Sequence, residues 1–297
     1  MSDVLTVGLP SGVGDCLWAL GKLRHAGPLH YRIADGWPYR TKPWFELLGP
    51  DVVASVDYGQ FSYTDIVTFE AAQGIGSHTR WGDLASQQWG QLLIEPNQHL
   101  EAGRPLADWL PDLPTDYHLP MFTSVEDQER AAKLVASYPR PLTAISAASY
   151  RGSEAWKTWG YAEWSPFLKR LHAELGGTIL LLGGFWDDLT ARIAEEDGYP
   201  CLVGKTSMGA MVEVLKHVKH YVGFSSGMGM LHAAMWGKTF LLWPDHQVGL
   251  SRSWADPVML DAGTYDTALW RHPDEVWWLC KRWLKRDGHA ERVAFQK

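Results

Sequence analysis

The sequence contains few cysteines, no excess of basic charge and no long apolar run, and each of these gaps excludes a class of protein. Its three cysteines, Cys16, Cys201 and Cys280, form no CxxC pair, which indicates unpaired thiols in a reducing compartment rather than a disulfide scaffold. Acidic residues outnumber basic ones by 34 to 27, for a net charge of −7, whereas an extended nucleic-acid surface needs a basic face. No apolar stretch approaches the ~20 residues of a transmembrane helix, and the amino terminus lacks the regions of a signal peptide. We therefore expect a cytoplasmic protein without a transmembrane segment.

The sequence also lacks the short motifs of the commonest metal and phosphate sites. It has no HExxH, no Cys/His metal spacing, no GxxxxGK(S/T) loop and no Asp-x-Asp pair. Its 12 histidines are scattered without the spacing of metal ligands. We therefore expect neither a required metal nor a cofactor.

What the chain does contain is a series of short apolar runs that alternate with amphipathic segments. With 46% apolar and 21% charged residues, it has the composition of a globular protein with a sizeable core. Runs that are apolar almost throughout are typical of parallel strands buried on both faces, and strands that alternate with helices indicate an α/β fold. The expected strands are 4–7, 29–33, 52–56, 66–69, 142–145, 178–182, 221–224 and 239–243.

This alternation breaks in the middle of the chain. Residues 73–120 carry few strand signals, a helix is expected over 125–137, and the stretch SYPRP then precedes a new apolar strand. We therefore place a domain boundary near residue 140. The expected division is a domain over 1–140, a second over 141–272, and a helix and tail over 273–297 that is apolar enough to pack back on the first domain.

The stretch LPSGVGDCLW, residues 9–18, puts a carboxylate on a glycine-rich turn between a strand and a helix. Gly12 and Gly14 let a ligand approach the backbone closely. A dinucleotide-binding fingerprint needs a third glycine where Leu17 stands, so a nicotinamide site is not expected. Spacing alone leaves two interpretations of Asp15 open, a helix-capping residue and a catalytic acid or base.

Three further stretches follow strands of the second domain and could bind a ligand. Lys157 lies in the connection after the strand at 142–145, where a cation could hold a diphosphate, although a solvated loop lysine is the simpler interpretation. The loop GGFWDD places Asp187 and Asp188 where a carboxylate could accept hydrogen bonds from ribose, or form a turn and an N-cap. The stretch VGFSSGMGM leads from a strand into a helix whose first N–H groups favour an anion.

This last stretch also matches the nucleophile elbow of the α/β hydrolases. In that interpretation Ser225 of GFSSG is the nucleophile, and Asp245 or Asp261 with His272 completes the triad. The short chain after Ser225 and the lack of an HGGG-like oxyanion loop count against it.

Two compositional features remain. One is a cluster of basic residues near the carboxyl terminus, and the other is the high tryptophan content. The cluster comprises Lys281, Arg282, Lys285 and Arg286, and a solvated helix face is its simplest explanation. Most of the 17 tryptophans are expected to serve packing. Trp18, Trp159 and Trp186 are candidates to stack on a sugar or a base.

Taken in order, these stretches resemble the heptosyltransferases, bacterial glycosyltransferases of the ADP-heptose:lipopolysaccharide type with a two-domain GT-B fold. The resemblance rests on SGVGD, on the loop with Lys157 and Trp159, on LLLGGFWDD, on GKTSM and on FSSGMGM. It covers the first 25 residues and most of 141–245, whereas 60–130 is not matched. The chain departs from the family at Ser225, where an acid is expected, and at Met230, where a histidine is expected, while His232 follows two residues later. It is therefore a divergent member.

The resemblance implies two Rossmann-like domains whose parallel sheets face each other across a cleft, and an inverting, metal-independent transfer of a hexose or heptose from a nucleotide-diphosphate sugar to a hydroxyl. Asp15 would be the general base, on the acceptor-side loop with Gly12 and Gly14. A glycan, a lipid-linked molecule or a modified DNA base is a candidate acceptor. A degenerate, non-catalytic binding protein is the alternative. The implied donor-binding residues are Lys157, Asp187, Asp188, Thr206, Ser207, Ser225, Ser226, Gly227, Met228 and Gly229.

Overall fold

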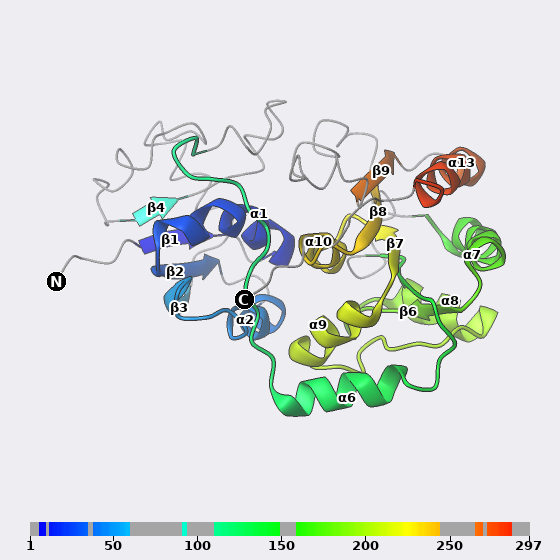
Figure 1. Cartoon of the computed structure of the whole chain (residues 1–297), viewed down its shortest axis with the longest axis horizontal. Helices are drawn as coiled ribbons and strands as arrows, with labels where there is room; N and C mark the ends of the chain where they lie inside the picture. Colours follow the sequence, from blue (N-terminus) through cyan, green and yellow to red (C-terminus); the bar gives the residue numbers. More distant parts are fainter. Residues whose placement is uncertain are drawn as a thin grey trace. The chain divides into compact units, whose positions relative to one another are not determined.

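The computed structural model describes residues 6–9, 12–34, 38–59, 91–93, 110–148, 159–243, 265–269 and 272–286. The chain divides into two compact units, Met1–Thr123 and Ser124–Lys297 (Figure 1). Each unit has its own parallel sheet with helices packed against it, as the alternation of strands and helices predicts. No helix within the described part of the chain is long and apolar enough to span a membrane.

Unit 1 is built on a four-stranded parallel sheet in the order β3-β2-β1-β4. Apolar residues of β1 and β2 and of the first helix, α1, form its core, among them Leu9, Leu20 and Ile33, which are fully buried. The strands are β1 (Thr6–Leu9), β2 (Leu29–Ala34), β3 (Val53–Gly59) and β4 (Gln91–Leu93), and the helices are α1 (Val13–Leu23), the short 3-10 helix η1 (Arg24–Ala26) and α2 (Pro38–Phe45).

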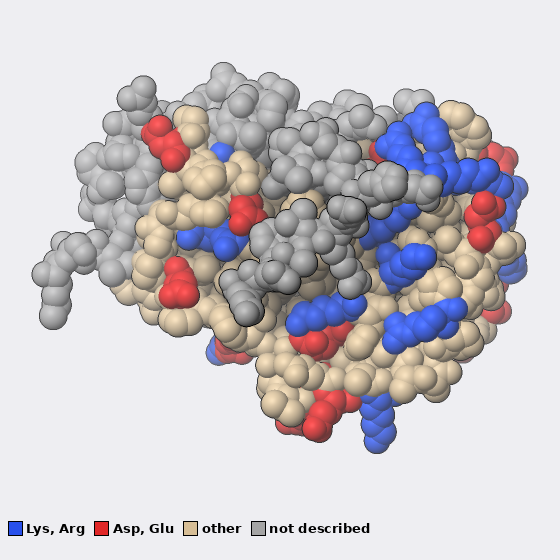
Figure 2. Space-filling view, in the orientation of Figure 1, with Lys and Arg blue, Asp and Glu red and all other residues tan. Residues whose placement is uncertain are grey.

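Unit 2 is built on a five-stranded parallel sheet in the order β6-β5-β7-β8-β9. The strands β5, β6 and β7 are buried throughout, as strands of all-parallel sheets covered by helices on both faces are. The face of unit 2 seen in Figure 2 shows more Lys and Arg side chains than Asp and Glu. The strands are β5 (Leu142–Ser146), β6 (Thr178–Leu181), β7 (His220–Phe224), β8 (Lys238–Trp243) and β9 (Tyr265–Leu269).

Two layers of helices enclose this sheet. Apolar residues of α7, α8 and α13 share one core cluster with the strands, with Trp164, Ile193 and Trp283 buried in it. The helix α10 contacts β7 and β8 from the other face, and α6 packs on α9. These helices are α6 (Val125–Val135), α7 (Tyr161–Leu175), α8 (Asp188–Asp197), α9 (Met208–His217), α10 (Gly227–Ala234) and α13 (Pro273–Leu284).

The division between the units lies at Thr123/Ser124, and not near residue 140 as the sequence suggests. Helix α6 belongs to unit 2 because polar contacts tie it to that unit: Arg130 donates to the carbonyl of Lys205 over 2.8 Å. The SYPRP stretch is also bound into unit 2, since Arg140 donates to the carbonyl of His217 and the carbonyl of Pro139 accepts from Thr178 Oγ1. A proline-rich stretch that resembles a linker is therefore an integral turn.

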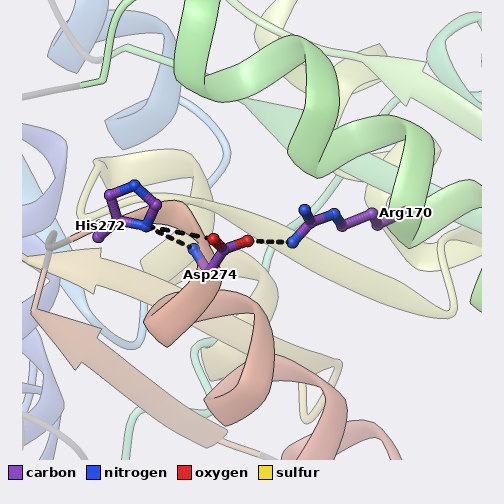
Figure 3. A network of polar contacts seen from close by, with 3 residues as sticks. All are labelled: Arg170, His272 and Asp274. Atoms are coloured by element: carbon purple, nitrogen blue, oxygen red, sulfur yellow. Dashed lines mark hydrogen bonds and ion pairs between the residues drawn. The ribbon is translucent and has the colours of Figure 1, made fainter.

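Helix α13 is part of the core of unit 2, which corrects the expectation that it packs back on the first domain. Its apolar face buries Val276, Cys280 and Trp283 completely. At its start, Asp274 forms an ion pair with Arg170 of α7 and lies near His272 (Figure 3). At its end, Lys238 Nζ donates to the carbonyls of Leu284 and Arg286.

Two buried histidines of unit 2 predict how its stability depends on pH. Burial lowers the pKa of His220 to about 3 and that of His232 to about 4, whereas both titrate near 6.5 when the chain is unfolded. Because the folded pKa is the lower one, stability is complete above pH 6.5 and is lost as the pH falls below it. We expect a loss on the order of 1 to 2 kcal/mol per histidine at pH 5, measured by urea denaturation. His220→Gln should flatten this pH dependence, whereas the same change at exposed His217 should leave it unaltered.

Candidate functional site

In each parallel sheet the order of the strands reverses at one strand: the chain places the next strand on one side of it and a later strand on its other side. In unit 2 this strand is β5, which lies between β6 and β7. In unit 1 it is β1, which lies between β2 and β4. Ligands of open α/β sheets bind beyond the carboxyl ends of the strands at such switch points. The loop after β1 is therefore the candidate site of unit 1, and the loops after β5 and β7 form the candidate site of unit 2. They are the glycine-rich, lysine-containing and serine-rich stretches of the sequence.

The helix α1 follows β1 in the chain, and its first turn carries the candidate base, whose side chain lies outside the described residues. Gly12 is the residue before the helix, in an extended conformation with no side-chain cap, and the N–H of Cys16 donates to its carbonyl over 2.9 Å. Gly14 and Asp15 are the second and third residues of α1. A carboxylate in the first turn of a helix is stabilised as the anion. This backbone position suits both the capping and the catalytic interpretation.

The loop after β7 places Ser225 and Ser226 at the start of α10. Ser226 caps the helix, because its Oγ accepts from the N–H of Gly229 over 3.5 Å and its carbonyl accepts from the N–H of Met230 over 3.0 Å. The N–H groups of Gly227 and Met228 lie in the first turn, where the intrahelical pattern supplies no acceptor. The positive end of the helix and these donors favour an anion at the carboxyl edge of β7.

Gly229 allows α10 to lie directly on the sheet. A Cβ atom at this position would come within 2.6 Å of Leu241 and 2.8 Å of Tyr221. The Tyr221 hydroxyl in turn lies 3.4 Å from Ser226 Oγ, and burial raises the pKa of this tyrosine to about 12. Gly229 therefore acts through close packing, and Tyr221, which carried no signal in the sequence, supports the serine that caps the helix.

The histidine that the family pattern expects has no counterpart at the surface of this loop. Met230, at the expected position, is buried. His232 is buried on the inner face of α10, where its Nδ1 lies 2.8 Å from Thr239 Oγ1 and its ring stacks on Tyr221. His232 therefore packs in the core, and it does not take over a ligand contact from position 230.

The loop after β6 distinguishes the two candidate carboxylates. Asp187 is buried and accepts a 2.7 Å hydrogen bond from the N–H of Gly184, which closes the loop on itself. Gly183 is needed there because a Cβ atom would lie 2.5 Å from the Asp187 carboxylate. Asp188 is exposed at the first position of α8. Asp187 thus shapes the loop, while Asp188 is the carboxylate that presents itself to solvent.

The candidate tryptophans have different positions. Trp159 was expected to stack on a sugar or a base. It is only 6% exposed and packs edge-on against Trp164 and Phe167, so it belongs to the core instead. Trp186 is half-buried in the loop after β6 and packs edge-on against Phe185, which is 64% exposed. The side chain of Trp18 lies outside the described residues.

Ser207 and Thr206 precede α9, and Ser207 is part of a polar network. Its Oγ caps α9 by accepting from the N–H of Ala210 and donates over 2.6 Å to Asp127 of α6. This hydrogen bond is the main reason that the pKa of Asp127 lies below its ordinary value. Asp127 was missed in the sequence, although Ser124-x-x-Asp127 has the spacing of a capping box and Ser124 Oγ does accept from the N–H of Asp127.

The remaining candidates are only partly placed. Lys157, Asp245 and Asp261 lie outside the described residues. His272, the histidine of the hydrolase interpretation, follows β9, two strands away from the strand that carries Ser225, and its Nδ1 accepts from the N–H of Asp274 (Figure 3). Within the described residues, no three His, Cys, Asp or Glu side chains form a group that could hold a metal ion.

Solved structures with the same fold are heptosyltransferases and a family 9 glycosyltransferase. The E. coli ADP-heptose LPS heptosyltransferase II is 15% identical with a TM-score of 0.60, over 95% of this chain and 98% of its own. A family 9 glycosyltransferase from Veillonella parvula is 13% identical with a TM-score of 0.60, over 96% and 90%. The E. coli heptosyltransferase WaaC, solved with ADP, is 14% identical with a TM-score of 0.56, over 94% and 100%. No curated protein sequence matches the chain.

The sequence profile of glycosyltransferase family 9 (heptosyltransferase) matches residues 72–262, more than half of the chain. The match includes most of 60–130, which the sequence motifs left unmatched, and does not include the Gly-x-Gly-Asp turn. It also replaces the serine-hydrolase interpretation of Ser225, because Ser225 lies within a glycosyltransferase domain. The two parallel sheets and this match together show that the chain belongs to glycosyltransferase family 9, the heptosyltransferase family, and is a glycosyltransferase of the GT-B fold.

Proposed function

We propose that the protein transfers a sugar from a nucleotide-diphosphate donor to an acceptor hydroxyl, with the donor bound at the carboxyl edge of the sheet of unit 2. The observation that carries this proposal is the position of the loops: the serine-rich start of α10 and the loop of Lys157 both follow strands at the switch point between β5 and β7. The E. coli heptosyltransferase WaaC, which was solved with ADP, supports a nucleoside diphosphate as part of the donor.

The donor diphosphate is the group that the start of α10 fits. In the proposal, the N–H groups of Gly227 and Met228 and the Lys157 ammonium bind it, and Ser225 and Ser226 border it. Thr206 and Ser207, which precede α9, lie in a second loop of the donor side. Exposed Asp188 accepts hydrogen bonds from the ribose hydroxyls.

Asp15 is the proposed general base. Its carboxylate takes the proton of the acceptor hydroxyl while the acceptor oxygen forms a bond to the anomeric carbon. The bond between that carbon and the diphosphate oxygen breaks on the opposite face, so the configuration is inverted. The charge that develops on the leaving diphosphate is stabilised by Lys157 and by the N–H groups of α10, without a metal ion. The acceptor, a glycan, a lipid-linked molecule or a modified base, stays a prediction from the sequence, as does a cytoplasmic location.

A thermal-shift screen tests the donor site. The protein is heated with UDP, ADP, GDP and CMP and with their sugars, with and without EDTA. We expect one nucleoside diphosphate to raise the melting temperature, because ligands that bind only the folded state stabilise it. EDTA should leave the shift unchanged and Lys157→Ala should abolish it.

Three other outcomes would change the proposal. A shift that EDTA removes would contradict metal independence. A nucleotide shift without release of nucleoside diphosphate from any donor sugar would favour the degenerate binding protein over the enzyme. If no nucleotide shifts the melting temperature, the donor site is not where we place it.

A further inference from the structure

The outer face of α13 combines an exposed tryptophan with a row of cations. Trp278 is 61% exposed, and the guanidinium of Arg282 lies 4.9 Å from the centre of its ring. Lys281, Arg282 and Lys285 follow Trp278 by three, four and seven residues, so all four side chains share one face of the helix. We call these four residues the basic-aromatic strip.

The strip is presented on a helix that is firmly held. The opposite face of α13 buries Val276, Cys280 and Trp283 in the core of unit 2. The exposure of Trp278 is therefore not a consequence of a helix that lacks packing. Exposed tryptophan is enriched at binding surfaces where one end of the ring meets an apolar environment and the other meets water.

The surroundings of the strip are basic although the protein as a whole is acidic. The two acids of α13, Asp274 and Glu275, are confined to its first turn. Two acids from outside the helix are each already paired with a cation, Glu174 with Lys281 over 2.9 Å and Asp266 with Arg286 over 3.0 Å. Beyond the strip, Lys238 adds a further cation at the end of the helix, where it donates to the carbonyl of Arg286.

Cations therefore predominate around the last two turns of α13. In the orientation that Figures 1 and 2 share, Lys and Arg side chains gather where α13 lies. With a net charge of −7 on the whole chain, this concentration of positive charge is a local property of unit 2.

We propose that the basic-aromatic strip of α13 docks unit 2 on an anionic lipid bilayer. The indole of Trp278 has an apolar body and a polar N–H, which suits the boundary between lipid head groups and acyl chains. The ammonium and guanidinium groups of the strip reach lipid phosphates from the same face, and Lys and Arg side chains close to an acidic membrane surface are attracted to it. A nucleic acid fits less well, since Arg282 already covers one face of the Trp278 ring, on which a base would stack.

Vesicle flotation tests this proposal with the full-length protein. The protein is mixed at low salt with vesicles of phosphatidylcholine, with and without phosphatidylglycerol. We expect it to float only with phosphatidylglycerol, and to be released as the salt concentration rises. Arg282→Glu combined with Lys285→Glu should lower the apparent partition coefficient more than tenfold, and Trp278→Ala about fivefold.

A charge-matched control separates the strip from net charge. Lys133→Glu combined with Arg192→Glu reverses two exposed cations on α6 and α8 and should leave flotation unchanged. All variants are first shown to melt within two or three degrees of the parent protein, which exposed positions predict. Flotation that is absent with phosphatidylglycerol, or equal in the strip and control variants, overturns the proposal. The proposal is also overturned if the parent protein binds duplex DNA but no vesicles, and the strip variants lose the DNA binding.

Discussion

Asp15→Asn is expected to lower the rate of sugar transfer by about 10²- to 10⁴-fold while nucleotide binding stays unchanged. The amide has the size of the carboxylate but cannot take the proton of the acceptor hydroxyl. The rate is measured as release of nucleoside diphosphate from the donor sugar that the thermal-shift screen identifies. The same screen gives the affinity for the nucleotide, which a base on unit 1 should not affect.

Asp51→Asn is the matched control for this prediction. Asp51 is an exposed acid of unit 1 that precedes β3, so its amide variant should retain the parent rate. A rate for Asp15→Asn within threefold of the parent would show that another group accepts the proton. A loss of nucleotide binding in the same variant would mean that Asp15 belongs to the donor site and not to the acceptor side.

Trp283→Ala is expected to destabilise the protein by about 3 to 5 kcal/mol, because it empties a large site in a packed core. Trp283 is fully buried, its ring centre lies 5.5 Å from that of Phe240, and Lys238 Nζ lies 5.2 Å from it. The loss should be seen as a lower midpoint in urea denaturation, with release of α13 from the sheet.

The same helix carries its own control for Trp283. Trp278→Ala removes an equally large side chain from the exposed face and should change stability by less than about 0.5 kcal/mol. Equal effects of the two substitutions would contradict the assignment of α13 to the core of unit 2. They would restore the expectation that α13 packs elsewhere.

Most of the strands could be predicted from their apolar residues, whereas β4 and β9 were missed. The prediction of 142–145 differs by one residue from β5, and 239–243 by one from β8. The strand β9 was missed because it contains Asp266, which is buried only through its pairing with Arg286, twenty positions later in the sequence. Local periodicity cannot anticipate a partner that tertiary structure supplies.

The boundary between the units was misplaced for a similar reason. Helix α6 was predicted correctly as a helix, but its attachment depends on Asp127 and Arg130, whose partners Ser207 and Lys205 lie about 80 residues later. In contrast, the loops of the site follow strand ends, and strand ends were predicted. The sequence therefore located the loops, whereas the separation of Asp187 from Asp188 and the burial of Trp159 and His232 needed the structure.

The central claim, that unit 2 binds a nucleotide-diphosphate donor at the carboxyl edge of its sheet, is tested most directly by hydrogen exchange. Exchange of backbone amides is followed by mass spectrometry with and without the nucleoside diphosphate that stabilises the protein. We predict slower exchange over 183–188, 205–210 and 225–230, since these segments form the loops after β6, before α9 and after β7. Protection confined to other segments, with 225–230 unchanged, would contradict the claim.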